Sequence, residues 1–112
     1  MIFVTGPRYS GKRVFVRNVL GLADDSEGKR YVQLSLADVG NATDIAAYAK
    51  ELEQYEVVIL PEVGSGVVPL NPEDVDLREK CGELAQHLAM EADVVVRVLC
   101  GIPQVLKGTL DL

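Results

Sequence analysis

The most informative segment of this chain is Gly6-Pro7-Arg8-Tyr9-Ser10-Gly11-Lys12, which matches the pattern G-x-x-x-x-G-K. A short apolar run at residues 1–5 precedes it and predicts a buried strand, and the residues from Gly11 onward predict a helix. In that setting the glycines let successive N–H groups curl around one anion, and the helix turns its positive end toward the same anion. Lys12 adds a mobile point charge for the terminal phosphates. The segment therefore predicts a phosphate-binding loop.

The residue after Lys12 departs from the full pattern, which ends in Ser or Thr because that hydroxyl binds magnesium. Arg13 stands there instead, and a guanidinium has only donors, so it cannot coordinate Mg²⁺. We expect phosphate binding, whereas metal-dependent phosphoryl transfer stays open, as does a glycine turn that no longer binds phosphate. The residues predicted to hold the nucleotide phosphates form one run: Gly6, Pro7, Arg8, Tyr9, Ser10, Gly11, Lys12 and Arg13.

A second candidate site residue is Glu62, in the run P-E-V-G-S-G at 61–66. It follows the apolar run 56–60, which predicts a strand buried on both faces. Ligands of open α/β sheets bind beyond the carboxyl ends of the strands, so Glu62 is predicted to face the phosphate loop. A carboxylate there can hold Mg²⁺ directly or through water, and the alternative is a solvated loop glutamate.

Alternating strand and helix patterns predict an α/β fold with a mostly parallel sheet in a single domain, residues 1–112. Four strands are predicted: 1–5, 31–36, 56–60 and 94–100. Three helices are predicted: one from Gly11, one capped by Asn41 with Asp44 in its first turn, and one from Pro72. The inward stripe of the last helix is Leu77, Cys81, Leu84, Ala85, Leu88, Ala89 and Ala92. Gly101-Ile102-Pro103 is expected to close the last strand, and the tail after Lys107 is expected to fray.

Charge and composition restrict the partners. The net charge of −6 argues against a nucleic-acid surface, yet the charged residues before Asp24 are all basic, which suits a small anionic ligand. No apolar run approaches the roughly 18 residues of a membrane span. Cys81 and Cys100 are predicted to be buried free thiols of a reducing compartment, so we expect a cytoplasmic protein.

Three residues of the last predicted helix carry weaker signals. Gly82 is interpreted as a point of close packing on the sheet or of close approach to a ligand. Arg78, four residues earlier, is either a surface arginine or a contact to an anionic ligand. His87, the single histidine, shares a polar face with charged neighbours and is predicted to be solvent-exposed and not catalytic.

Several motifs resemble those of the adenosylcobinamide kinase / adenosylcobinamide-phosphate guanylyltransferase family of cobalamin biosynthesis. Residues 6–13, G-P-R-Y-S-G-K-R, resemble the family's G-G-x-R-S-G-K-S, and residues 61–69, P-E-V-G-S-G-V-V-P, resemble N-E-V-G-x-G-I-V-P. Residues 78–86, R-E-K-C-G-E-L-A-Q, resemble R-D-x-x-G-x-x-N-Q, and the family's A-D is Ala92-Asp93. Residues 101–107, G-I-P-Q-V-L-K, resemble the closing G-I-P-x-x-L-K.

The resemblance implies a RecA-like P-loop domain that binds ATP or GTP with Mg²⁺. It implies phosphoryl transfer to the hydroxyl of the aminopropanol arm of adenosylcobinamide, a corrinoid. Lys12 would then stabilise the phosphates, Glu62 would be the metal or base-side carboxylate, and Arg78 and Gln86 would support the nucleotide or the corrinoid. Because the family's enzymes are oligomeric, a homo-oligomer is expected.

The chain also departs from the family. Family members are longer, and the stretch missing between Tyr31 and Glu56 would carry the guanylylated histidine and a Walker B carboxylate. Arg13 and Ala85 stand where the family has Ser and Asn. We therefore expect the guanylyltransferase reaction to be lost. The alternative is a non-catalytic nucleotide- or corrinoid-binding paralogue that acts as a partner subunit or regulator, and a generic small-molecule P-loop kinase would explain only the first motif.

Overall fold

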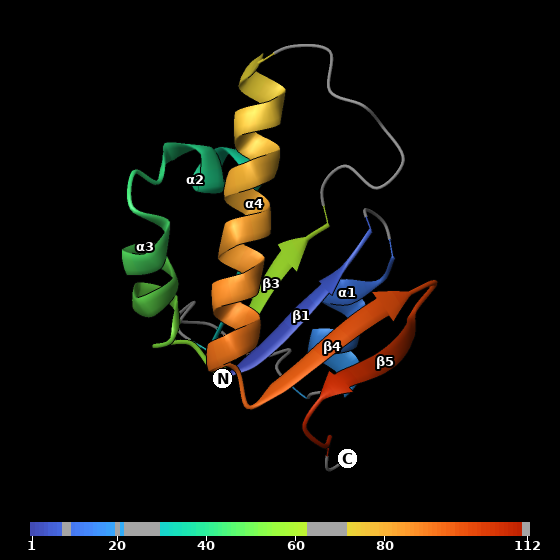
Figure 1. The fold of residues 1–112 in the computed structure, drawn as a ribbon. Helices are drawn as coiled ribbons and strands as arrows, with labels where there is room; N and C mark the ends of the chain where they lie inside the picture. Colours follow the sequence, from blue (N-terminus) through green and yellow to red (C-terminus); the bar gives the residue numbers. More distant parts are fainter. Residues whose placement is uncertain (8–9, 20, 22–29, 63–71, 111–112) are drawn as a thin grey trace.

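The fold is built on one five-stranded sheet, seen in Figure 1. The computed structural model of the chain describes residues 1–7, 10–19, 21, 30–62 and 72–110. The strands are β1 (Ile2–Gly6), β2 (Tyr31–Gln33), β3 (Val57–Pro61), β4 (Val94–Leu99) and β5 (Ile102–Lys107). Their order across the sheet is β2-β3-β1-β4-β5; the first four run parallel, and β5 pairs antiparallel with β4. The predicted α/β fold with a mostly parallel sheet is confirmed.

Helices cover both faces of this sheet, which gives three layers (Figure 1). One face carries α2 (Leu36–Asn41), α3 (Ile45–Leu52) and α4 (Pro72–Glu91). The other face carries α1 (Lys12–Val14), which continues as a π-helical segment, η1 (Phe15–Val19). The helix predicted after Gly11 is therefore present, with its second part in the wider π form.

The hydrophobic core lies in two clusters, one on each side of the sheet. In β3 the side chains of Val58 and Leu60 join the cluster under α2, α3 and α4, while Val57 and Ile59 join the cluster under η1. All four are at most 1% exposed, which explains why this strand is continuously apolar rather than alternating. The predicted stripe of α4 also packs inward, with Cys81, Leu84, Leu88 and Ala92 buried and Leu77, Ala85 and Ala89 partly buried against the same cluster.

The segment between β2 and β3 differs from the prediction. Asn41 does not cap a helix but ends α2, a helix that was not predicted. This helix starts because Ser35 and Asp38 form a capping box, in which each side chain accepts from the other residue's backbone N–H. The next helix, α3, is capped by Asp44, whose carboxylate accepts from the Ala47 N–H at 3.1 Å.

The C-terminal segment also differs, because Gly101-Ile102-Pro103 turns the chain into a further strand. Cys100 and Gly101 form the two-residue turn between β4 and β5 and have φ angles of 52° and 76°. Positive φ at both central residues is what a tight hairpin requires. Cys100 is exposed on this turn, so the prediction of two buried thiols holds for Cys81 alone. The chain stays packed beyond Lys107 as far as Leu110, which lies against the η1-side cluster.

Burial has a chemical consequence at Cys81, because desolvation raises the pKa of its thiol and keeps it protonated.

Among the described residues no helix is both long and apolar enough to cross a membrane.

Candidate functional site

The predicted phosphate loop begins where β1 ends. This strand lies in the middle of the parallel part of the sheet, between β3 and β4, and its carboxyl end leads through the loop into α1. Ligands of open α/β sheets bind beyond this edge. Of the predicted loop residues, Arg8 and Tyr9 lie outside the described residues.

The two glycines of the loop adopt backbone conformations that side chains rarely permit. Gly6 has a φ of 151° and Gly11 a φ of 92°. A Cβ on Gly6 would lie 2.3 Å from the carbonyl oxygen of Val98, and one on Gly11 would lie 3.1 Å from Cα of Gly101. Glycine is therefore needed at both positions, since the loop is folded tightly against the end of β4 and the turn that follows.

The side chain of Lys12 folds back onto the loop. Lys12 is 7% exposed, and its Nζ donates to the carbonyl oxygen of Pro7 at 2.6 Å and to Oγ of Ser10 at 3.4 Å. Desolvation lowers the pKa of Lys12, while the negative charge of Glu62 opposes that shift. The loop thus holds a poorly hydrated cation against its own oxygen atoms, where an anion would gain most from it.

The turn between β4 and β5 closes one side of the loop. The backbone N–H of Gly101 donates to the carbonyl oxygen of Ser10 at 2.6 Å. The Gly-Ile-Pro motif near the end of the chain is thereby connected to the Gly-rich motif near its start, about 90 residues earlier. This contact could not be predicted from the two motifs, because it depends on how the turn after β4 packs against the loop.

Glu62 lies beside the loop, as predicted. Its backbone N–H donates to the carbonyl oxygen of Gly6 at 2.9 Å, and its charge acts on Lys12. Both carboxylate oxygens accept from Arg97: Oε1 from Nε at 2.5 Å and Oε2 from a terminal guanidinium nitrogen at 3.0 Å. This bidentate pair raises the pKa of Arg97 further. Sequence analysis missed Arg97, although a charge within the apolar strand V-V-V-R-V-L was a usable signal.

The side chains around the loop are a poor set of ligands for a magnesium ion. The hydroxyl that follows Lys12 in the full pattern is replaced by Arg13, whose side chain is exposed and has no acceptor. The oxygens of Glu62 are both engaged by Arg97. In the described part of the chain, no group of three or more His, Cys, Asp or Glu side chains is arranged to hold a metal ion. Glu62 as a magnesium ligand stays a prediction that this donor set does not favour.

Arg78 and Gln86, the two α4 residues predicted to support the ligand, lie at different positions along the helix. Helix α4 ends at the amino edge of the sheet, where the Asp93 N–H donates to the Met1 carbonyl at 2.9 Å. Gln86 is exposed and only five residues from that end, so the structure does not bring it to the loop. Arg78 is half-buried in the first half of α4, away from the helix end at the amino edge. Ligand roles for both remain predictions.

Comparison with known proteins identifies the family. A family model described as cobinamide kinase / cobinamide phosphate guanyltransferase matches residues 35–106, well over half of the chain. The chain belongs to this family. No curated protein matches the chain. The family match relates it to cobalamin biosynthesis and confirms the resemblance drawn from the motifs. Because the match begins after the phosphate loop, the function of the loop rests on its own geometry.

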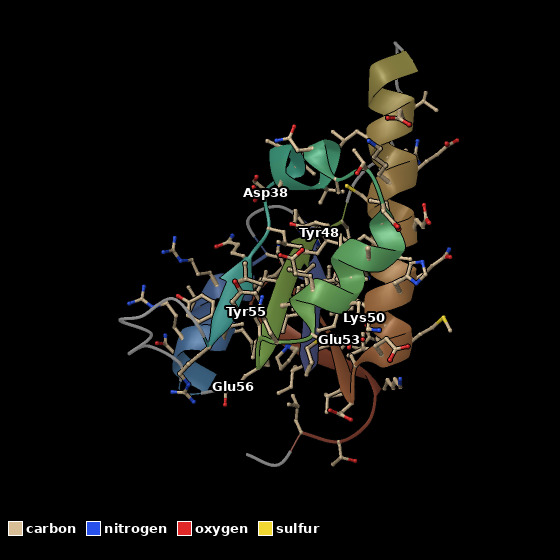
Figure 2. All side chains as sticks on the ribbon, turned by 90° about the vertical axis from the view of Figure 1, so that its left-hand side faces the viewer. Asp38, Tyr48, Lys50, Glu53, Tyr55 and Glu56 are labelled. Atoms are coloured by element: carbon tan, nitrogen blue, oxygen red, sulfur yellow. The ribbon has the colours of Figure 1, made fainter. Side chains whose placement is uncertain are left out.

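The single histidine is the residue to consider for the guanyltransferase half of the family description. His87 is not fully exposed, since its side chain is 39% accessible and its Nε2 lies 3.8 Å from Oε1 of Glu83. It lines a cavity of about 340 Å³ between α3 and α4, together with Lys50 of α3 and Glu53, the residue that follows α3; both are labelled in Figure 2. His87 is four residues before the end of α4, which lies at the amino edge of the sheet, and His87 therefore does not join the loop at the carboxyl edge.

Gly82 has a different environment from the predicted one. It is exposed on α4, and a Cβ at this position would have no atom within 4 Å. Close packing on the sheet is therefore the wrong explanation for this glycine.

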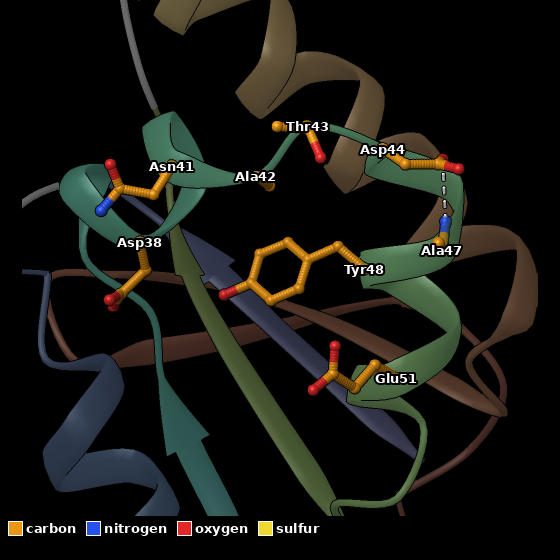
Figure 3. A pocket seen from close by; sticks show the side chains of 8 residues that line it. All are labelled: Asp38, Asn41, Ala42, Thr43, Asp44, Ala47, Tyr48 and Glu51. Atoms are coloured by element: carbon orange, nitrogen blue, oxygen red, sulfur yellow. Dashed lines mark hydrogen bonds between the residues drawn. The ribbon is translucent and has the colours of Figure 1, made fainter.

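A second cavity, of about 430 Å³, lies between α2 and α3 (Figure 3). The ring of Tyr48 extends across it, with the hydroxyl directed toward Asp38 (Figure 3). Desolvation, and then the charges of Asp38 and Glu51, raise the pKa of Tyr48. Asp44 also lines this cavity. Three carboxylates would repel a phosphate group, so this cavity is not the anion site.

Proposed function

We propose that the chain binds a nucleoside triphosphate, ATP or GTP, at residues 6–13 and serves as a cobinamide kinase. The observation that carries this proposal is the order β1, glycine loop, α1, with the Lys12 ammonium held against the loop oxygens. This order supports the proposal because, in a P-loop domain, backbone N–H groups and a lysine between a strand and a helix hold phosphates.

In the proposed reaction the hydroxyl oxygen of the aminopropanol arm of adenosylcobinamide attacks the γ-phosphorus. The bond from that phosphorus to the bridging oxygen breaks, the nucleoside diphosphate leaves, and the hydroxyl loses its proton. Lys12 stabilises the charge that develops on the phosphate oxygens. Glu62, whose backbone N–H donates to the carbonyl oxygen of Gly6 beside the loop, is the carboxylate that we propose takes up the proton.

The alternative is a nucleotide- or corrinoid-binding relative that transfers nothing and acts as a partner subunit or regulator. Two observations favour it: Arg13 has no group that binds a metal, and the Glu62 carboxylate is engaged by Arg97. For the guanyltransferase half of the family description, the position of His87 between α3 and α4 supports its loss.

A transfer assay tests the proposal and separates it from this alternative. The chain is incubated with adenosylcobinamide and with ATP or GTP labelled in the γ-phosphate, once with EDTA and once with magnesium. We expect label to appear in the corrinoid and to disappear in Lys12→Met, while Lys50→Met, an exposed lysine of α3, behaves as wild type. Nucleotide binding without any labelled corrinoid would select the non-catalytic alternative. An absence of nucleotide binding would exclude the kinase and would leave only a corrinoid-binding form of the alternative.

A further inference from the structure

We propose that Arg97 supplies, beside Lys12, a further positive charge to this phosphate site in place of a magnesium ion. On this proposal, which rests on the proposed nucleotide binding at residues 6–13, the loop accepts the nucleotide as the metal-free anion.

The position of Arg97 relative to the loop is the first support. In the pairing of β1 with β4, Arg97 lies directly beside Thr5, the residue before Gly6. Its guanidinium reaches across the end of β1 to Glu62, whose backbone N–H is bonded to Gly6. The Arg97–Glu62 pair therefore spans the point where the loop leaves the sheet.

The balance of charge at this point is the second support. Lys12 and Arg97 each bring one positive charge, and Glu62 brings one negative charge close enough to act on Lys12. An uncompensated carboxylate at the mouth of the loop would repel phosphate, and in most P-loop sites a metal ion offsets such charges. Here the offset is built into the chain, since the guanidinium contacts both carboxylate oxygens.

The third support is that a metal ion would have to displace Arg97 from Glu62. The Arg97 and Glu62 side chains are 34% and 25% exposed, so the pair is partly shielded from water. A magnesium ion would need an oxygen of Glu62 that Arg97 now contacts, and it would find no hydroxyl at position 13. A phosphate, in contrast, can share the guanidinium with Glu62, because an arginine has five N–H donors and this pair uses two of them.

Titration calorimetry of the wild-type chain with ATP and with GTP tests this proposal directly. One series contains EDTA and the other contains excess magnesium. We expect the affinity in EDTA to equal or exceed that in magnesium. Binding that is about tenfold or more tighter with magnesium would overturn the metal-free site while leaving the proposed function intact. If neither nucleotide binds in either series, the proposed function fails and this inference fails with it.

Substitutions of Arg97 and Glu62 distinguish Arg97 as the counter-charge from Glu62 as a metal ligand. If Arg97 is the counter-charge, Arg97→Gln weakens nucleotide binding in EDTA by about tenfold or more, and Glu62→Gln strengthens it because repulsion is removed and the guanidinium is released. If Glu62 is instead a metal ligand, Glu62→Gln weakens binding in magnesium and Arg97→Gln does not. Arg97→Lys should fall between wild type and Arg97→Gln, since it keeps the charge but loses the bidentate fork.

The chain offers a matched control in a second arginine–glutamate pair. Arg30 Nε donates to Oε2 of Glu56 at 2.7 Å, at the amino edge of the sheet and opposite the loop. Arg30→Gln removes the same charge and should leave nucleotide affinity unchanged. An equal loss of affinity in Arg30→Gln and Arg97→Gln would show that only the net charge matters and would overturn the role of Arg97.

Discussion

At the scale of single residues, two glycines show how the same residue type serves different purposes. The loop needs Gly6, because a Cβ would meet the Val98 carbonyl oxygen at 2.3 Å and because its φ of 151° is rare for other residues. The helix does not need Gly82, which has open space around it. Sequence analysis could assign Gly6 because a motif surrounds it, whereas the environment of Gly82 depends on which face of α4 meets the sheet.

These environments predict opposite effects of the same substitution. Gly6→Ala should destabilise the chain by about 2–4 kcal/mol, since the backbone of β4 must move to admit the methyl group. Gly82→Ala should stabilise it by about 0.5–1 kcal/mol, because alanine favours an exposed helix position. Urea unfolding followed by circular dichroism measures both changes. A loss of stability in Gly82→Ala would show that this face of α4 is packed against something.

At the scale of the secondary-structure elements, the strand and the long helix with regular apolar patterns could be predicted, whereas β5 and the short helix α2 could not. The apolar run of β3 and the stripe of α4 follow directly from burial, so their periodicity is visible in the sequence. Strand β5 was missed because all six of its residues are exposed and it is held by backbone pairing with β4, which leaves no hydrophobic pattern. Helix α2 was missed because it is six residues long and is set by its cap.

The capping box of α2 gives a prediction at this scale. Ser35→Ala removes the hydroxyl that accepts from the Asp38 N–H, so the free energy of unfolding should fall by about 1 kcal/mol. Ser35→Thr keeps a hydroxyl in the same place and should retain most of the stability. Thermal or urea unfolding of the three proteins provides the measurement. Equal stability of Ser35→Ala and wild type would mean that the box does not hold α2.

At the scale of the whole molecule, the candidate site is assembled from three distant segments. The loop after β1, Glu62 after β3, and Arg97 with the following turn all meet at the carboxyl edge of the sheet. Parallel strands place their carboxyl ends together, so the meeting of the loop and Glu62 could be predicted from the order of elements. The pairing of Arg97 with Glu62 and the contact of Gly101 with Ser10 could not, since they depend on strand order and register.

The family match and the loop geometry support different conclusions, the first about the pathway and the second about the anion site. The match over residues 35–106 relates the chain to cobinamide kinase / cobinamide phosphate guanyltransferase, and it does not include the loop. The loop contributes the buried Lys12 and two glycines at positive φ, which are the physical basis for an anion site. We therefore propose that residues 6–13 bind nucleotide through Lys12.

That claim is tested most directly by calorimetric titration of ATP and GTP into wild type, Lys12→Met and Lys50→Met, each both in EDTA and in magnesium. We expect saturable binding to wild type and Lys50→Met, with affinity lowered by about tenfold or more in Lys12→Met, because one charge-assisted contact to phosphate is removed. The unfolding transition of Lys12→Met is measured alongside to establish that the variant is folded. Absence of binding to wild type, or equal affinity of folded Lys12→Met and wild type, would contradict nucleotide binding through Lys12.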